Sequence, residues 1–217
     1  MFAKQINKPN GWLAFELNVL RRLKFASIML AFTGETHLGS YLKRWNVRVL
    51  ANNSMQSSWT KAVAAIQNNG EKISEDEVNV ILEDAYVPRY RLQNAALRRW
   101  YNETDAWWFD NIRQNIEKLS SPVAKAVALS LGMSVGDYVL SFAEETLELR
   151  QPLSTVYRRL QSVLPEPINN GQNNTCHNKT INEFLAENYL DLMFLRLPAA
   201  HNQSQRMRLG TEAWREE

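Results

Sequence analysis

Two short segments carry the residue types that could bind or transform a ligand. The first, Phe32–Thr36, is a turn containing one glycine, and it directly follows the apolar run Ile28–Phe32. The second, Asp191–Ala199, starts as another apolar run. An open parallel sheet binds its ligands at the carboxyl ends of its strands, where a glycine turn lets a ligand approach the backbone and the positive end of a helix. The two segments therefore predict a ligand site at the edge of such a sheet.

The residues at these positions supply only part of that chemistry. Gly34 and Gly39 provide some of a glycine-rich loop, but Thr36 stands where a second loop glycine is expected. An acidic side chain after the second strand would accept hydrogen bonds from ribose hydroxyls. Asn52 and Asn53 stand there instead, and an amide is a poorer acceptor for a diol than a carboxylate. Ordinary turn and capping roles also explain these residues.

The elements around the first segment alternate between helix and strand. Apolar residues at helical spacing and short continuous apolar runs predict helix 10–26, strand 28–32, helix 36–45, strand 47–51 and helix 54–68, the last closed by Gly70. Such alternation indicates a parallel sheet with right-handed crossovers.

The pattern then changes to helices without strands. Ser74 with Glu77 predicts a capping box, Thr104 or Asp105 caps a helix to Leu119, and Ser121 with Pro122 opens the next one. After a loop at 165–174 we expect a strand at 175–178, a helix at 180–188 begun by Thr180 and Glu183, and a buried strand at 191–195. The predicted organisation is an α/β part at 1–70, a helical insertion at 71–164, and a second α/β part with a polar tail at 165–217.

Composition narrows the class of protein. The chain has 217 residues, 45% of them hydrophobic, and a formal net charge of +2, which is too small to argue for nucleic-acid binding by itself. The single Cys176 excludes an intramolecular disulfide framework and fits a reducing compartment. The longest apolar run is far too short to span a bilayer. We expect a cytoplasmic protein without a membrane association.

The order of these segments resembles the Dam-type adenine-specific DNA methyltransferases, which use S-adenosylmethionine and include restriction-modification enzymes. The resemblance covers most of the chain and is one of order and spacing. It rests on Phe32, Gly34, Leu42–Lys43, Val47, Val49–Leu50, Asn52–Asn53, the segment 107–116, Asn178, Thr180, Asn182–Leu185, Asp191–Leu192 and Phe194–Leu195. It implies a Rossmann-like methyltransferase sheet with a helical insertion. The cofactor-binding positions that it implies are Phe32, Gly34, Glu35, Thr36, Asn53 and Asp191.

The departures from the family pattern fall on its chemistry. Its catalytic tetrad, Asp-Pro-Pro-Tyr, is replaced here by Arg196, Leu197, Pro198 and Ala199. In the family the acid accepts hydrogens from the target amine, and the aromatic ring stacks on the flipped base. Arg196 has only donors and Ala199 has no stacking face. The resemblance therefore implies a catalytically inactive member that binds S-adenosylmethionine weakly or not at all and acts as a binding or assembly subunit.

Two other functions remain open from the sequence. One is an active S-adenosylmethionine-dependent DNA adenine methyltransferase, completed by a partner chain. The other is a DNA-binding module that uses arginine and aromatic residues of the insertion, a combination suited to phosphate contact and base stacking. Its candidate residues are Arg89, Arg91, Arg98, Arg99 and Trp100. Tryptophans that pack the insertion and arginines that solvate it are the competing explanation.

Other chemistry finds little support in the sequence. The three histidines lack the spacing of zinc ligands, and we expect no metal. Cys176 and His177 are neighbours on a predicted strand, so their side chains should point to opposite faces. The resemblance implies further strands beside the one at 191–195, but the remaining 20 or so residues are polar and too few for them, so this strand should form an open edge of the sheet. We expect the C-terminal tail, a homodimer mate or another protein to cover that edge.

Overall fold

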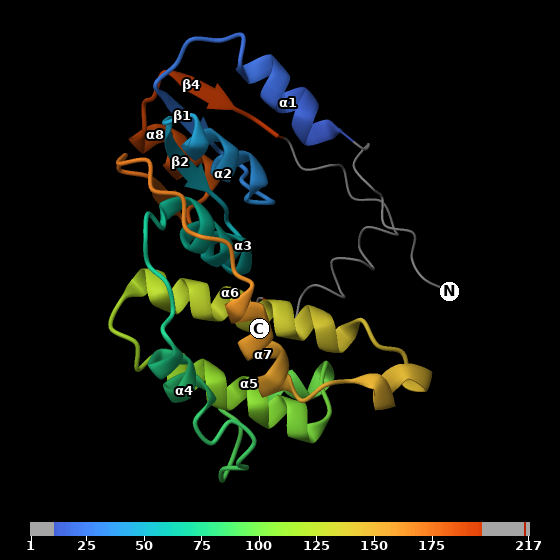
Figure 1. The fold of residues 1–217 in the computed structure, drawn as a ribbon. Coiled ribbons are helices and arrows are strands. Elements are labelled where there is room, and N and C mark those ends of the chain that lie inside the picture. Colours follow the sequence, from blue (N-terminus) through green and yellow to red (C-terminus); the bar gives the residue numbers. More distant parts are fainter. Residues whose placement is uncertain (1–10, 197–214, 216–217) are drawn as a thin grey trace. The chain divides into compact units, whose positions relative to one another are not determined.

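A computed structural model describes residues 11–196 and Arg215. The described residues divide into two compact units. Residues 11–69 and 168–196 form the α/β unit, and residues 70–167 with Arg215 form the helical unit. Figure 1 shows the elements of both units along the chain. Leu197, Pro198 and Ala199, three of the four positions of the lost tetrad, lie outside the described residues.

The α/β unit contains a four-stranded, all-parallel sheet in the order β3-β2-β1-β4. The strands are β1 (Ser27–Leu30), β2 (Arg48–Asn52), β3 (Thr175–His177) and β4 (Leu192–Phe194). Ile28 pairs with Val49 on one side and with Leu192 on the other, which fixes the register. The predicted α/β class and parallel pairing are confirmed; β1, β3 and β4 are one or two residues shorter than predicted, and β2 is shifted by one residue.

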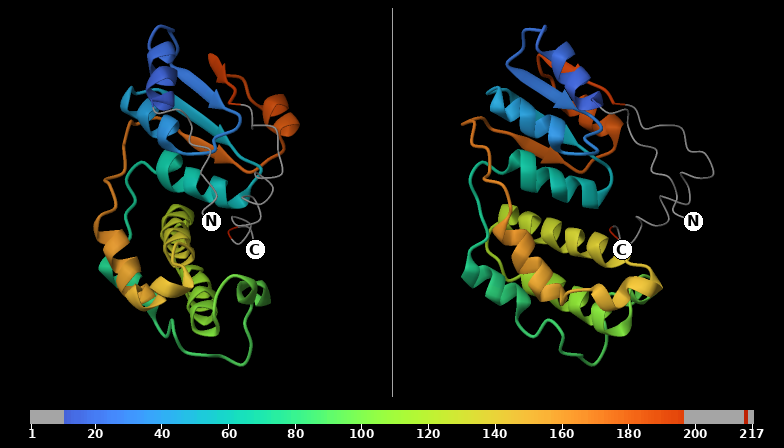
Figure 2. Two further views of the ribbon diagram at one scale, coloured as in Figure 1. Left: turned by 90° about the vertical axis from the view of Figure 1, so that its right-hand side faces the viewer. Right: turned by 45° about the vertical axis from the view of Figure 1, so that its right-hand side comes forward.

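Helices cover both faces of this sheet. α1 (Trp12–Leu20), α2 (His37–Arg44) and α3 (Gln56–Ala62) pack on the face that carries Ile28, Leu30 and Val49. α8 (Ile181–Glu187) packs Phe184 on the other face, against Met29 and Leu50. Figure 2 shows α1 and α8 on opposite sides of the sheet. Because successive side chains of a strand point to opposite faces, the strands contribute to two separate apolar clusters, one on each face of the sheet.

Several details of the α/β unit differ from the sequence prediction. The first helix, predicted for 10–26, ends at Leu20. The helix predicted to run to residue 68 changes at Val63 into a π-helical turn, Val63–Gln67. Thr36 stands at the start of α2, but its side chain makes no capping hydrogen bond. Gly39 is a packing residue: a Cβ there would lie 2.3 Å from Cδ1 of Ile66, so α2 approaches the π turn closely only because this position is glycine.

The helical unit is built from α4 (Glu75–Leu82), α5 (Glu103–Ile116), α6 (Pro122–Leu140) and α7 (Leu153–Ser162), with 3₁₀ turns at Ala95–Arg99 and Glu144–Leu149. Its centre is the fully buried Trp108, whose indole N–H donates to Ser154 Oγ at 2.9 Å. Trp107 and Tyr101 are buried as well. These rings therefore pack the core of the helical unit, which agrees with the explanation that the tryptophans pack the insertion and do not form a binding surface.

The caps of this unit follow local chemistry. The capping boxes at Ser74 and, in the α/β unit, Thr180 are both present, and Ser121 caps α6 with proline at its first turn. The predicted cap at Thr104 or Asp105 is wrong. Asn102 begins α5, and its side-chain oxygen accepts from the N–H of Asp105 at 2.9 Å.

One helix of the described chain, α6, is long and apolar enough to cross a membrane by length and composition alone. Half of that segment is buried within the protein. Tyr157 of α7 donates its hydroxyl to the carbonyl of Ala128 in α6 at 3.2 Å, which ties the two helices together.

Candidate functional site

The candidate site lies at the carboxyl edge of the sheet, because all four strands run in the same direction. β1 leads into the turn that holds Gly34, β2 into Asn53, β3 into Lys179, and β4 into Arg196. The sheet thus places the turn after β1 at the same edge as Asn53 and Arg196, where the expected ribose-binding acid and catalytic acid are missing. Ligands of parallel sheets bind at this edge.

The turn after β1 is compatible with a close backbone approach. Gly34 has a φ of +53°, and no atom lies within 4 Å of the position that its Cβ would occupy. Glu35 is exposed and Thr36 half-buried at the start of α2. Phe32, predicted as a cofactor contact, packs instead against the apolar cluster beneath α8. The turn is open at its glycine, while its aromatic residue belongs to the core.

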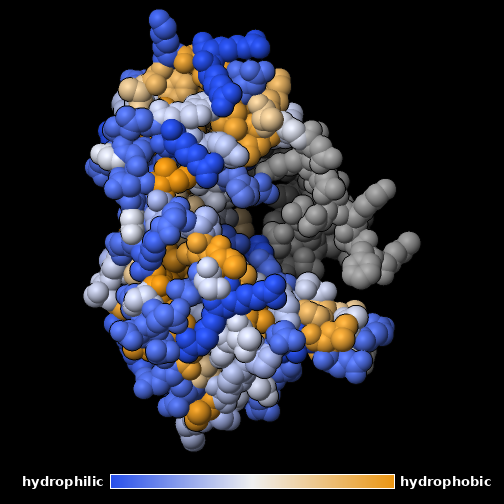
Figure 3. All heavy atoms as spheres, viewed as in Figure 1, coloured by the Kyte–Doolittle hydropathy of each residue, from blue (hydrophilic) through white to orange (hydrophobic). Residues whose placement is uncertain are grey.

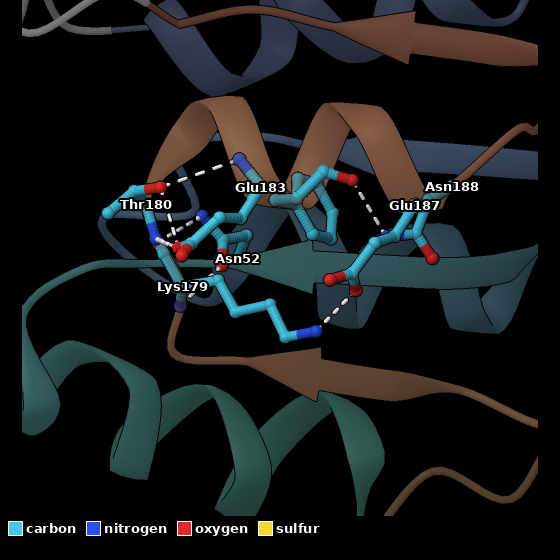
Figure 4. Close-up of polar contacts among 7 residues, drawn as sticks. Asn52, Lys179, Thr180, Glu183, Glu187 and Asn188 are labelled. Atoms are coloured by element: carbon cyan, nitrogen blue, oxygen red, sulfur yellow. Dashed lines mark hydrogen bonds and ion pairs between the residues drawn. The ribbon is translucent and has the colours of Figure 1, made fainter.

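Asn52 joins three segments at this edge. Its side chain is buried, and its oxygen accepts from the N–H of Lys179 at 3.1 Å while its nitrogen donates to the carbonyl of Lys179 at 3.1 Å (Figure 4). Its carbonyl accepts both the N–H and the hydroxyl of Thr33 at 3.0 Å. The side chain of Asn52 therefore holds the segment after β3 to the end of β2, and its backbone carbonyl holds the turn after β1 there.

Asn53 occupies the position expected to bind ribose, but its acceptor is already in use. Its side-chain oxygen accepts the N–H of Met55 at 2.9 Å, which closes a turn before α3. Its N–H donates to the carbonyl of His177, and its carbonyl accepts from the side chain of Asn178 at 2.8 Å. A diol at this position would have to displace the turn.

Arg196, the first position of the lost tetrad, forms an ion pair with Glu16 of α1. Its Nε donates to one carboxylate oxygen at 2.9 Å and an Nη donates to the other. The Glu16 side chain is 4% exposed and the Arg196 side chain 20% exposed. A bidentate pair of this kind holds both groups in a defined geometry. The residue that replaces the catalytic acid is therefore part of the internal packing of α1 against the sheet.

Asp191, predicted as a cofactor residue, does not belong to this site. It precedes β4 and lies at the amino edge of the sheet, where its carboxylate accepts the N–H groups of Ala26 and Ser27, both at 2.9 Å. The hydrogen bond from Ala26, followed by those from Ser27, holds the pKa of this carboxyl below its usual value. The sequence pattern gave the position of the strand, although the predicted burial is wrong, since Met193 is 48% exposed. An acid before a parallel strand lies at the opposite edge from a glycine turn after one.

Cys176 and His177 diverge, as expected for neighbours on a strand. Cys176 packs against the cluster beneath α2 and α3, and burial raises the pKa of its thiol to about 12. His177 lies against Phe184 of α8, with ring centroids 5.5 Å apart, on the other face. The two side chains cannot form a catalytic dyad. Within the described residues no group of three or more histidine, cysteine, aspartate or glutamate side chains could hold a metal ion.

Lys43, named from the sequence only as part of the family resemblance, is a buried cation. Its side chain is 1% exposed, and its Nζ donates to the carbonyl of Asn68 at 2.5 Å, at the end of the π turn. Desolvation lowers the pKa of this amine to about 8. Its neighbours in the sequence gave no signal, because a lysine in the last turn of a helix is usually exposed and complements the helix dipole.

In the helical unit, the candidate nucleic-acid residues divide into two groups. Arg89 and Arg91 lie in an exposed loop on either side of Tyr90, whose side chain is fully exposed. Arg98 and Arg99 lie in the 3₁₀ turn, where Arg98 is 3.6 Å from the carboxylate of Glu103. Trp100 is half-buried at the end of that turn. The loop presents the exposed ring of Tyr90 and two arginines, of which Arg89 donates to Oε1 of Gln114 in α5 at 2.7 Å.

Polar side chains of α5 hold this loop in place. Asn111 is fully buried, and its side-chain nitrogen donates to the carbonyls of Asp84, Ala85 and Val87 at 2.9–3.2 Å. Asp110 accepts the N–H groups of Gln93 and Asn94 at 3.0 and 2.9 Å. These contacts secure the backbone on both sides of Tyr90. The sequence analysis did not predict that Asn111 and Asp110 hold this loop. Buried polar residues within a helix rich in aromatic residues do not alter its hydrophobic spacing, so the sequence pattern does not reveal them.

No protein-family model matches this chain, and comparisons with curated proteins and with solved structures give no match either.

Proposed function

We propose that this protein is a methyltransferase-like Rossmann scaffold that has lost its chemistry and serves as a binding or assembly subunit. The strand order β3-β2-β1-β4, all parallel, corresponds to the first four strands of the Rossmann order. The helical unit lies in the sequence between β2 and β3, where the Dam-type resemblance predicts an insertion. These two features support the scaffold, and the carboxyl edge supports the loss of activity.

The observation that carries this proposal is the ion pair between Arg196 and Glu16. Methyl transfer to an adenine amine needs an acceptor at this strand end, and a guanidinium has only donors. The buried carboxylate of Glu16 does not replace the acceptor, because both of its oxygens receive hydrogen bonds from Arg196.

The second strand end supports the same conclusion. Asn53 lacks the negative charge that would hold a ribose diol, and its oxygen accepts the N–H of Met55. Cofactor affinity would therefore depend on the turn at Gly34 alone. We propose that S-adenosylmethionine binds weakly or not at all.

Transfer of a labelled methyl group to adenine-containing duplex DNA tests the loss of catalysis. We expect no label in the DNA above a protein-free control, whereas a functional adenine methyltransferase in the same assay labels it. Label that appears only when a second purified chain is added would instead support the active enzyme completed by a partner. Label transferred by this chain alone would contradict the proposal.

A second function, nucleic-acid binding by the helical unit, is favoured by the loop around Tyr90. The loop presents an exposed ring between two arginines on a backbone held by α5. Two nearby acids are engaged: Glu83 pairs with Lys118, and Asp110 accepts backbone N–H groups. Exposed aromatic and arginine side chains bind nucleic acid by stacking and phosphate contact.

Tyr90→Ala is expected to weaken binding of a fluorescent oligonucleotide about tenfold or more, because stacking of a base on an aromatic ring contributes about 1–3 kcal/mol. Fluorescence anisotropy at moderate salt measures the affinity. The matched control is Tyr189→Ala, which removes an equally exposed tyrosine from the α/β unit and should leave binding unchanged. Equal loss in both variants, or no binding by the wild-type chain at low salt, would eliminate this second function.

A further inference from the structure

The two edges of the sheet are treated differently by the described structure. At the β3 edge, side chains satisfy the outward backbone groups. The N–H of Cys176 donates to the side-chain oxygen of Gln67 at 3.0 Å, and the carbonyl of Cys176 accepts from the indole N–H of Trp59 at 3.0 Å. At the other edge, β4 pairs with β1 on one side, and no described residue bonds to its other side. An uncovered edge strand is a template for pairing with another strand.

An exposed apolar stripe on α1 borders this open edge. Trp12, Phe15 and Val19 follow one another at helical spacing on α1, and Leu23 lies just beyond the end of the helix; each is between 41% and 60% exposed. Figure 3 shows hydrophobic side chains at the surface in the region where Figure 1 labels α1 and β4. A soluble helix normally turns such a stripe toward a core.

Glu16 fixes which side of α1 carries the stripe. At 100° per residue, Glu16 lies between the stripe and the packed side formed by Leu13, Leu17 and Leu20. Its ion pair with Arg196 ties this part of the helix to the end of β4. The stripe therefore lies on the side of α1 that faces the open β4 edge, and the packed side of α1 lies over β1 and β2.

The other face of the edge is apolar too. Met193 pairs with Met29, which faces α8, so Met193 lies on the α8 face, and it is 48% exposed. Leu195 follows at strand spacing and is also half-exposed. The edge thus needs a strand that is apolar on both faces, as a strand inside a doubly covered sheet is.

We propose that a second copy of this chain occupies the edge, with the β4 strands of the two copies paired antiparallel about a two-fold axis. β4 itself is the described strand that meets the requirement, since Leu192–Leu195 is apolar on both faces and has a free edge. The pairing joins two sheets into one. It also brings the α1 stripes of both copies together on one face, because a two-fold axis perpendicular to a sheet preserves its faces.

Charges do not oppose this arrangement. Arg196 is neutralised by Glu16, and the stripe from Trp12 to Val19 contains no exposed charged residue. The basic residues Arg21, Arg22 and Lys24 lie at one end of α1, so antiparallel helices keep the two basic groups apart. With like faces paired, residues opposite each other include Met193 with Met193 of the other copy, and Leu192 with Phe194.

The oligomeric state of the full chain tests this pairing, which deepens the proposed assembly role and rests on it. We expect light scattering after size exclusion to give a dimer over a roughly hundredfold concentration series. Met193→Lys and Val19→Glu should each give a monomer with an unchanged circular dichroism spectrum, since both side chains are exposed. Val163→Glu, at an exposed apolar residue of the helical unit, should remain dimeric.

Cross-linking tests the register directly. In a Cys176→Ala background, Met193→Cys should form a disulfide between copies under mild oxidation, because equivalent residues on the axis lie within bonding reach. Leu149→Cys, an exposed position in the helical unit, should not cross-link. A wild-type monomer throughout the series, or a dimer that both edge variants leave intact, would overturn the pairing. Neither result bears on methyl transfer, which the labelling assay decides separately.

Discussion

Arg196→Ala is expected to lower the free energy of unfolding of the α/β unit by about 3 kcal/mol, because it leaves the buried carboxylate of Glu16 without a partner. The partial exposure of Arg196 places the effect at the lower end of the range for buried pairs. Replacing both residues, as Glu16→Leu with Arg196→Met, should recover most of the loss, since apolar residues of similar volume avoid the desolvation cost. Urea denaturation followed by circular dichroism measures each variant.

Lys179→Ala is the matched control for that prediction. Lys179 pairs with Glu187 in the same unit, but the two side chains are 37% and 52% exposed, so its loss should cost below about 1 kcal/mol. Arg196→Asp, which would restore the family's acid, should destabilise at least as much as the alanine variant, because it places a second carboxylate against Glu16. If Arg196→Ala matched the control, the ion pair would not be a structural element of the unit.

The second large effect is a rise in stability at alkaline pH caused by Lys43. The pKa of its amine is about 8 in the folded protein against an ordinary value of 10.5, because burial disfavours the charged form. Between these values the unfolded chain binds more protons than the folded chain, so the free energy of unfolding rises with pH. From pH 8 to 10.5 the rise should reach up to about 3 kcal/mol, and below pH 8 the protein bears the full cost of burying the charge.

Lys43→Met should remove this rise. It should also raise stability at pH 7 by about 2 kcal/mol, which is the recovered desolvation cost less about 1 kcal/mol for the hydrogen bond to Asn68. Lys24→Met, at an exposed lysine, should change neither quantity. The difference between Lys43→Met and wild type isolates the amine from Cys176 and the buried tyrosines, which also titrate at high pH. An unchanged pH slope in Lys43→Met would contradict the assignment.

The parts of the fold that local chemistry determines were predictable from the sequence. Apolar runs at 28–32 and 47–51 gave β1 and β2, and the Ser74 and Thr180 capping boxes gave the starts of α4 and α8. The alternation of strand and helix gave the parallel pairing. These features depend on neighbours within a few positions, which the sequence displays directly.

The features that depend on distant contacts were not predictable. The π turn after α3 coincides with a buried lysine bond from α2, and no local pattern encodes it. The partner of Arg196 is 180 positions away, so the sequence showed that a guanidinium replaced an acid and not what it binds. Asp191 was assigned to the site because the Dam-type resemblance implied it, although it lies at the other edge of the sheet.

We propose that the polar groups at the carboxyl edge are engaged in internal contacts and cannot bind S-adenosylmethionine. Isothermal titration of the full chain with S-adenosylmethionine tests this proposal most directly. We predict no saturable heat at ligand concentrations up to about 1 mM, a limit that corresponds to binding weaker than about 4 kcal/mol. Saturable micromolar binding that S-adenosylhomocysteine competes for, and that Asn53→Ala weakens, would contradict this account.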